Sequence, residues 1–238
     1  MSIWRTEQLQ DNSSSVGLVT LRDFIRWGGT RFAEAQLHFG HGSDNPLDEA
    51  AALVLYLLHI PHERSEAYLD AVLTEVERRA VEEVFQLRIE KRLPAAYITH
   101  EAWFAGLSFY VNEDVLVPRS PIAELIEAGF APWIDPKRVN RVLDLCTGSG
   151  CIAIATAYAF PEAEVDATDI SNQALEVAKE NRSRHDLSDR LNLIHSDIYE
   201  RLQGKRYDVI VTNPPYVDDL EMQILPKEYR HEPRIGLE

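Results

Sequence analysis

A glycine-rich turn between a buried strand and an apolar helix constrains the fold of this 238-residue chain more than any other feature. Arg141–Cys146 is a short apolar run, Thr147-Gly148-Ser149-Gly150 follows at once, and Cys151–Ala157 continues with helical composition. Strand, glycine turn and helix, in this order, form the nucleotide-cradling unit of doubly wound α/β sheets. Glycine lets the backbone approach a ligand closely, and the first helical turn presents unpaired N–H groups. The sequence therefore predicts an α/β fold with a candidate ligand site at this turn.

Two further strands are predicted to end in carboxylates. Ala163–Ile170 carries Asp169 about twenty residues past the turn, the position at which such folds hold a ribose diol. Leu191–His195 is followed by Asp197, which can accept a hydrogen bond from an adenine amino group or cap the segment that follows. The turn alone leaves open an NAD site, an S-adenosylmethionine (SAM) site or a tight connection without a ligand.

The fourth predicted strand, Tyr207–Thr212, ends in Asn213-Pro214-Pro215-Tyr216. The two prolines fix φ and lack N–H donors, so the backbone carbonyls there are predicted to be uncommitted acceptors. Asn213 adds a side-chain carbonyl and Tyr216 a flat aromatic face. This arrangement fits an amide or exocyclic amino group that loses a proton while its nitrogen attacks an electrophile. The alternative is a proline-rich turn after a strand.

The predicted site is a convergence of strand ends. Ligands of open α/β sheets bind outside the carboxyl ends of the strands. We therefore expect one crevice to gather residues that are scattered in sequence: Gly148, Gly150, Asp169, Asp197 and Asn213.

These motifs resemble the class I SAM-dependent methyltransferases, and within them the family that methylates glutamine side-chain amides in proteins. Asp144–Gly150 looks like their first motif, Asp169 like the acidic residue after the second strand, and Asn213–Tyr216 like their substrate motif. A finer resemblance, to the PrmB-type branch of the HemK/PrmC-related family, rests on three further segments: Trp103–Phe109, Val115–Pro121 and Glu228–Pro233. That branch methylates large-subunit ribosomal protein three. The related release-factor branch usually reads Pro-Arg-Pro-Asp where this chain has Pro118-Arg119-Ser120-Pro121.

The resemblance implies SAM as cofactor and a set of site residues. The implied cofactor-binding residues are Cys146, Thr147, Gly148, Ser149, Gly150, Asp169, Asp197 and Ile198. Asn213, Pro214 and Tyr216 are implied to be catalytic, and Asn213, Pro214, Pro215, Tyr216 and Arg119 to bind substrate. For Arg119 a surface salt bridge is the alternative. Cys146 occupies a position often filled by glycine, and we expect only a mild perturbation provided its φ is not positive.

The chain is expected to comprise a helical substrate-recognition domain over residues 1–97, a β-hairpin linker over 98–120 and a methyltransferase domain over 121–238. Asn45-Pro46 predicts the start of a helix that runs from Leu47 to Ile60. A long helix with one apolar stripe is predicted from Leu69, Val72, Leu73, Val76, Ala80, Val84 and Leu87. Trp103–Val117 predicts the hairpin, with its turn at Asn112-Glu113-Asp114.

The resemblance also implies a seven-stranded sheet, whereas four strands are predicted before Glu238, with a fifth possible after Pro226–Arg230. We therefore expect a sheet truncated at its C-terminal side, with apolar surface at the edge after the fourth strand. A homo-oligomer could bury that surface.

Composition limits the partners. A formal net charge of −15 disfavours a DNA substrate, whose affinity depends on Lys and Arg, and suits a basic protein such as a ribosomal protein. The two cysteines lack zinc-site spacing and the eight histidines lack metal-site pairing, so reduced thiols and no metal site are expected. The absence of a signal-peptide pattern and of a run of eighteen apolar residues predicts a cytoplasmic protein without membrane contact.

Three other functions fit the same motifs: a release-factor glutamine methyltransferase, an adenine-N6 methyltransferase acting on a flipped base of a nucleic acid, and a non-catalytic assembly factor that keeps the fold.

Overall fold

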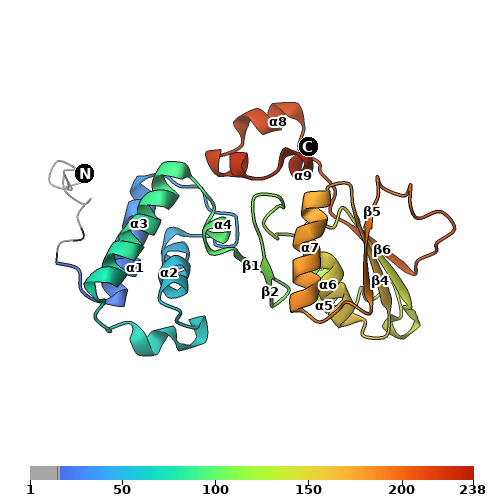
Figure 1. Cartoon of the computed structure of the whole chain (residues 1–238), viewed down its shortest axis with the longest axis horizontal. Coiled ribbons are helices and arrows are strands. Elements are labelled where there is room, and N and C mark those ends of the chain that lie inside the picture. Colours follow the sequence, from blue (N-terminus) through green and yellow to red (C-terminus); the bar gives the residue numbers. More distant parts are fainter. Residues whose placement is uncertain (1–14, 16) are drawn as a thin grey trace. The chain divides into compact units, whose positions relative to one another are not determined.

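A computed structural model describes Ser15 and residues 17–238 of the chain. The chain divides into two compact units, one ending at Thr99 and the other covering His100–Glu238 (Figure 1). The polar segment Asn12-Ser13-Ser14-Ser15, whose composition predicts a loose segment, lies outside the described residues except for Ser15.

The first unit is helical, as predicted. It contains α1 (Leu21–Glu34), α2 (Pro46–Leu57), a 3-10 helix η2 (His62–Tyr68), α3 (Glu75–Lys91) and α4 (Ala95–Thr99). The side chain of Asn45 accepts hydrogen bonds from the N–H groups of Leu47 and Asp48, so the predicted cap is confirmed. The helix ends at Leu57, before the predicted Ile60, because the backbone turns there and His59 adopts a left-handed φ of 53°.

The core of this unit is built from aromatic rings and one buried ion pair. Phe24, Trp27, Phe32 and Phe85 pack together, with Phe32 and Phe85 meeting edge to face at 5.1 Å. Arg88 Nε donates to Glu49 Oε1 over 2.7 Å, and both side chains are 1 % exposed. Such a pair fixes one packing of α2 against α3, because losing either partner leaves a buried charge.

The predicted apolar stripe of the long helix is only partly correct. A capping box between Thr74 and Glu77 starts α3 at Glu75, so Leu69–Leu73 lies outside the helix. The buried face of α3 is formed by Val81, Phe85 and Arg88, whereas Val76 and Leu87 are exposed. Because the apolar period was counted through a cap that breaks the helix, the stripe includes exposed residues, although its member Val84 packs against the core.

The second unit is the α/β fold. Its parallel sheet has the order β5-β4-β3-β6, formed by β3 (Arg141–Leu145), β4 (Glu164–Asp169), β5 (Leu191–His195) and β6 (Val209–Thr212). All four predicted strands are confirmed within two residues at each end. The helices α6 (Cys151–Ala159) and α7 (Asn172–Arg184) connect successive strands, and α5 (Ile122–Glu127) packs on α6. The helices that follow β6 are α8 (Asp219–Ile224), η4 (Lys227–His231) and α9 (Arg234–Leu237).

The predicted hairpin exists, but its turn is elsewhere. The strands are β1 (Glu101–Phe104) and β2 (Leu107–Tyr110), which pair antiparallel around Ala105-Gly106. Both turn residues have positive φ, 48° and 72°, as a two-residue hairpin turn of this twist requires. The predicted turn at Asn112-Glu113-Asp114 is a separate bend after the hairpin, in which Asp114 N–H donates to Asn112 Oδ1.

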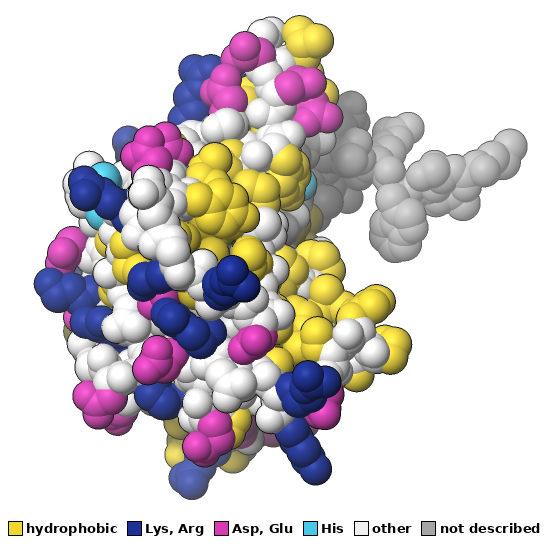
Figure 2. Space-filling model, turned by 90° about the vertical axis from the view of Figure 1, so that its right-hand side faces the viewer, with side chains coloured by type: hydrophobic (Ala, Val, Ile, Leu, Met, Phe, Trp, Pro, Cys, Tyr) yellow, Lys and Arg dark blue, Asp and Glu magenta, His cyan; other side chains and the backbone are white. Residues whose placement is uncertain are grey.

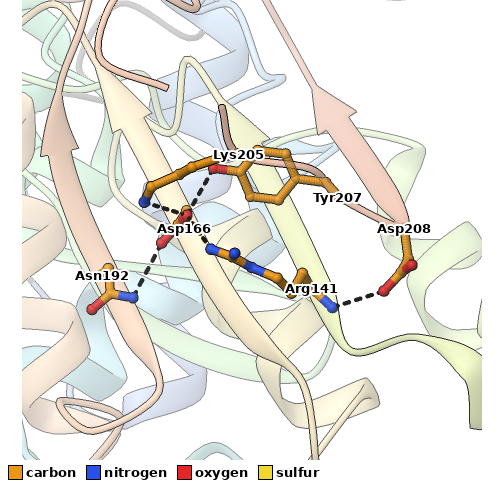
Figure 3. A network of polar contacts seen from close by, with 6 residues as sticks. All are labelled: Arg141, Asp166, Asn192, Lys205, Tyr207 and Asp208. Carbon is orange, nitrogen blue, oxygen red and sulfur yellow. Dashed lines mark hydrogen bonds and ion pairs between the residues drawn. The ribbon is translucent and has the colours of Figure 1, made fainter. Parts of the chain in front are cut away.

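The amino ends of the strands carry a polar network centred on Asp166 (Figure 3). Asp166 of β4 is buried, and its Oδ2 accepts hydrogen bonds from Lys205 at 2.8 Å and Tyr207 at 2.7 Å. Arg141 of β3 adds an ion pair and Asn192 of β5 a bond to Oδ1, so this one carboxylate ties three strands and the segment before β6 together. Burial by itself raises the pKa of Asp166, but the hydrogen bonds from Lys205, Tyr207 and Asn192 outweigh it and the pKa is lowered.

One edge of the sheet is formed by β6, which pairs only with β3 among the described residues. Ile210 on this strand is half exposed. Apolar surface therefore lies at this edge, as predicted.

Candidate active site

A cavity of about 380 Å³ lies at the carboxyl edge of the sheet, within the second unit. Segments after all four strands line it, together with the segment Asp114–Ser120, which precedes the sheet. The lining contains every predicted site residue except Gly150: Arg119, Cys146, Thr147, Gly148, Ser149, Asp169, Asp197, Ile198, Asn213, Pro214, Pro215 and Tyr216. The volume falls in the range of roughly 300–1,000 Å³ that is usual for small-molecule sites.

The two glycines of the turn are needed for different structural reasons. Gly148 has a φ of +55°, and a Cβ built there meets no heavy atom within 4 Å, so the space in front of it is open to a ligand. Gly150 has a φ of +81° and precedes α6; a Cβ there would lie 3.2 Å from Ala178 Cβ on α7. Gly150 therefore allows close helix packing, while Gly148 faces the cavity.

The expectation of a mild perturbation at Cys146 required a φ that is not positive, and this condition is not met. Cys146 has a φ of +60°, because the chain reverses sharply as it leaves β3. A left-handed conformation costs a residue other than glycine about 1–2 kcal/mol, so Cys146 stores strain beside the cavity. Burial raises the pKa of its thiol, and the nearby carboxylates of Asp169 and Asp144 raise it further. Both cysteines stay protonated at neutral pH, since burial raises the pKa of Cys151 to about 12.

Asp169 is held by the glycine turn and by the start of α7. Its Oδ2 accepts the Gly148 N–H over 2.9 Å and its Oδ1 accepts the Ser171 N–H over 2.9 Å. A carboxylate has about four acceptor positions, so two remain for a ligand such as a ribose diol.

Asp197 follows β5, the strand next to β4 in the sheet. Its carboxylate makes no hydrogen bond with the described part of the chain, and the neighbouring Ser196 hydroxyl accepts the Arg201 N–H instead. The capping alternative for Asp197 is thus not observed. Ile198, also a cavity residue, is more than half exposed.

No individual role was predicted for Asp144, yet its side chain holds the glycine turn against the start of α6. This residue is 1 % exposed, and its Oδ2 accepts from the Thr147 hydroxyl at 2.6 Å and the Ala153 N–H at 3.1 Å. Its Oδ1 is buried without a hydrogen-bond partner. Burial raises the pKa of Asp144 to about 7, although both hydrogen bonds act to lower it. The one sequence signal for this role is the position of Asp144 near the end of a buried strand.

The Asn213–Tyr216 segment keeps its acceptors free. In residues 15 and 17–238, no intramolecular hydrogen bond reaches the half-buried Asn213 side chain or the Pro214 carbonyl. The N–H groups of Tyr216 and Val217 donate to the Leu237 carbonyl at 3.0 and 2.8 Å, which anchors the segment to α9. The Tyr216 side chain is 79 % exposed, so its ring does not pack over the acceptors in this structure.

The far wall of the cavity comes from two segments distant in sequence, Asp114–Ser120 and Pro233–Glu238. Arg119 joins them with a bidentate ion pair to Glu232, at 2.8 and 2.6 Å, and its guanidinium lies 4.9 Å from the Tyr229 ring. Glu232 is fully buried and also accepts the Val117 N–H. Sequence reasoning missed this wall, because nothing local signals a pair separated by 113 positions.

The charges of the cavity select the kind of ligand. Four carboxylate residues line it, Asp114, Asp169, Asp197 and Glu238. Among the lining residues Arg119 is the only cationic side chain, and it is held by Glu232. A dinucleotide pyrophosphate would be repelled there, whereas a cationic sulfonium compound with a ribose and a base is favoured. The residues present therefore fit SAM and fit NAD poorly.

No helix among the described residues is both long and apolar enough to span a membrane, and the same residues contain no cluster of three metal-ligating side chains.

Comparisons with known proteins agree with this geometry. Residues 130–227 match the family model described as "Methyltransferase small domain". A "Ribosomal protein uL3 glutamine methyltransferase" of Xanthomonas campestris pv. campestris is 54% identical over 220 residues, which cover 92% of this chain and 71% of that protein. Proteins of the same description are 51% identical in Bordetella pertussis, over 95% of this chain and 76% of that one, and 48% identical in Neisseria meningitidis serogroup B, over 95% and 75%.

Among solved structures, a Thermus thermophilus 16S rRNA N2 G1207 methyltransferase in complex with AdoMet and guanosine is similar at 24% identity. The likeness covers 49% of this chain and 32% of that one, with a TM-score of 0.40.

Proposed function

The chain belongs to the ribosomal protein uL3 glutamine methyltransferases, and on this premise we propose that its cavity transfers a methyl group from SAM to a glutamine side-chain nitrogen (N5) of ribosomal protein uL3, the large-subunit protein three. The observation that carries the proposal is the cavity itself, which gathers the free acceptors of Asn213 and Pro214, the Gly148 turn and Asp169 at one edge of the sheet.

On the cofactor side, Asp169 would accept hydrogen bonds from the ribose hydroxyls. The lining residues Cys146, Thr147, Gly148 and Ser149 of the turn would hold the cofactor, with Gly150 shaping the turn behind them. Asp197 would accept from the adenine amino group, and Ile198 would contact the base. The negative charge of the cavity favours the sulfonium. When bound, SAM supplies a methyl group that is strongly electrophilic because it is attached to a positive sulfur.

On the substrate side, the problem is a weak nucleophile, since the amide lone pair is delocalised into its carbonyl. Asn213 Oδ1 and the Pro214 carbonyl accept the two N–H bonds of the glutamine amide. These bonds orient the nitrogen and stabilise the positive charge that develops on it. Pro215 keeps the backbone in this shape, and Tyr216 covers the amide plane once substrate is present. The proton becomes acidic as the nitrogen is alkylated, so alignment rather than a strong base is the main source of rate.

Arg119 contributes through the wall that it holds. Its two terminal nitrogens donate to Glu232, which fixes the residues before Pro233 against Val117. We propose that this wall shapes the entry of the substrate peptide. A variant Arg119→Lys keeps the charge but loses the bidentate geometry, and is expected to raise KM for uL3.

We propose that residues 1–97 form the substrate-recognition domain, 98–120 its hairpin linker and 121–238 the catalytic domain. A net charge of −15 supports a basic partner, because opposite charges speed encounter. The expected signature is a kcat/KM for uL3 that falls steeply with salt. Because ribosomal protein uL3 is the substrate, we place the enzyme in the cytoplasm, which fractionation of cells carrying a tagged chain tests.

The edge of β6 is proposed as a route to self-association, since Ile210 leaves apolar surface beside free backbone groups. Sedimentation of the chain at several concentrations tests this. An Ile210→Lys variant that sediments as the wild type at every concentration argues against it.

The names and identities of the relatives favour uL3 over the alternatives. Release factors share the chemistry but are not the named substrate. Against an adenine-N6 activity, the face shown in Figure 2 has Lys and Arg interspersed with Asp and Glu rather than gathered into a continuous basic surface.

The deciding experiment offers the chain uL3, release factors and duplex DNA in parallel, with SAM, and measures mass. A gain of about 14 daltons on one glutamine of uL3 alone is expected. A gain on a release factor or on adenine instead would replace uL3 with that substrate. SAM binding without methylation of any of them would support the non-catalytic alternative.

A further inference from the structure

Asn181, in the middle of α7, is fully buried and makes three hydrogen bonds, all to backbone groups of other segments. Its Oδ1 accepts the Tyr110 N–H over 2.7 Å. Its Nδ2 donates to the Tyr110 carbonyl at 2.9 Å and to the Ser149 carbonyl at 2.8 Å. Both N–H donors of the amide are therefore engaged.

Two of these bonds dock the hairpin. In the antiparallel pair of β1 and β2, the backbone groups of alternate residues point away from the partner strand. Ser108 and Tyr110 are such residues of β2, and Asn181 offers Tyr110 the donor and acceptor that a third strand would provide. One helical turn later, His185 Nε2 lies 2.9 Å from the Ser108 carbonyl, and its ring packs on Phe109 at 5.1 Å between centroids.

The third bond reaches the glycine turn. Ser149 lines the cavity and is buried at 3 % exposure, and its carbonyl is held by Asn181. The chain that follows β2 becomes the opposite wall of the same cavity at Asp114–Ser120. A single side chain thus connects the strand leading into one wall with the turn that forms the other.

We propose that Asn181 is a positioning residue of the cofactor site, which fixes the glycine turn relative to the hairpin and so makes SAM affinity depend on where the hairpin sits. The identity of the ligand rests on the function proposed above, whereas the coupling of turn and hairpin does not. No other side-chain type of this size offers one acceptor and two donors, so aspartate and leucine each leave buried carbonyls unpaired.

The test compares Asn181→Asp with His185→Phe. Aspartate removes both donations, leaving the carbonyls of Tyr110 and Ser149 without a partner. Phenylalanine keeps a ring against Phe109 and loses the hydrogen bonds of His185 to the Ser108 carbonyl and the Tyr158 hydroxyl, neither of which belongs to the glycine turn. If Asn181 only docked the hairpin, the two variants would behave alike.

We expect Asn181→Asp to weaken SAM binding by about tenfold or more in calorimetry, the effect of one buried hydrogen bond lost. Amide exchange of residues 147–150 should become faster without ligand, and the KM for SAM should rise with kcat changed less than about twofold. His185→Phe should lower stability in urea while SAM affinity stays within about twofold. Unchanged SAM affinity in a folded Asn181→Asp, or an equal loss in both variants, overturns the proposal.

If Asn181→Asp does not fold, the wild type decides. Coupling is reciprocal, so saturating SAM must slow amide exchange at Tyr110 in the wild type, and no slowing overturns the proposal. None of these measurements uses uL3. A chain that binds SAM as expected but leaves uL3 unmethylated contradicts the proposed function without touching the role of Asn181.

Discussion

The two ends of the same four strands are built in opposite ways. At the amino ends, both oxygens of Asp166 receive donors, which come from Arg141, Asn192, Lys205 and Tyr207 (Figure 3). At the carboxyl ends, the acceptors of Asn213 and Pro214 have no partner in the described chain, and Asp144 Oδ1 is buried without a donor. The contrast separates a stabilising edge from an edge whose hydrogen-bonding capacity is left for ligands.

Two buried aspartates on neighbouring strands, Asp144 and Asp166, show the same contrast in their pKa values. Burial raises the pKa of Asp144 to about 7 and works in the same direction at Asp166, where the donors reverse it and leave the pKa lowered. The left-handed Cys146 also lies beside the cavity, so a strained residue accompanies the free acceptors at the carboxyl edge.

The largest effect is expected at the free acceptors. Asn213→Ala removes a side-chain acceptor for the reacting amide and should lower kcat by roughly 10²–10³-fold, as the loss of one preorganised transition-state hydrogen bond does. SAM affinity should stay within about twofold, because the cofactor is assigned to Asp169 and the turn. Single-turnover kinetics and calorimetry measure the two quantities. If Asn213→Ala abolishes SAM binding while Asp169→Ala leaves it unchanged, the roles assigned to the two residues are wrong.

The next effect is a pH dependence of stability from Asp144. Its folded pKa of about 7 exceeds the reference value of 3.8, so the folded state binds more protons between these values and stability falls as pH rises through that window. The slope from this group is at most about 1.4 kcal/mol per pH unit. Asp144→Asn should remove that slope in urea unfolding between pH 4 and 7. If the difference in unfolding free energy between the wild type and Asp144→Asn does not change with pH, the pKa of Asp144 is not raised by burial.

Asp166→Asn tests the amino edge. Lys205 and Arg141 are about one third exposed at their side chains, so screening limits the loss to about 2 kcal/mol at neutral pH. Because the pKa of Asp166 is lowered, its stabilisation is present above the reference value of 3.8 and is lost as the pH falls through the folded pKa. SAM affinity should not change. A drop in SAM affinity as large as the drop in stability would erase the division between the edges.

The smallest effect is expected at Cys146. Cys146→Gly relieves the strain of a left-handed φ of 60°, but glycine also gives the unfolded chain more conformational freedom, which offsets part of the gain. We expect a net stabilisation of the fold by about 0.5–1 kcal/mol. Thermal unfolding at constant pH measures this. Gly148→Ala is the matched control, since it introduces the same type of strain at a φ of 55° and places a methyl group in the open cavity. Destabilisation by Cys146→Gly shows that the thiol contributes packing that exceeds its strain.

The sequence predicted the parallel sheet because each strand is a short apolar run ended by a polar residue, and these ends share one edge by geometry. It predicted the helix start at Asn45 because a capping side chain followed by proline is also a local signal. It failed where distant residues decide. The pair of Arg119 and Glu232, and the bonds from Asn181 to Tyr110 and Ser149, join segments that no local pattern relates. The apolar stripe failed because a cap at Thr74 broke the period.

We propose above that the glutamine nitrogen and the cofactor methyl group meet in one cavity, next to Asn213. A bisubstrate analogue, in which a glutamine side-chain nitrogen is joined through one carbon to the adenosine half of SAM, measures this directly. We predict that the wild-type chain binds it at least about a hundredfold more tightly than S-adenosylhomocysteine, as expected of a compound resembling the transition state, and that Asn213→Ala loses most of this advantage. Equal affinity for the two compounds in the wild type, or an advantage that survives Asn213→Ala, would contradict it.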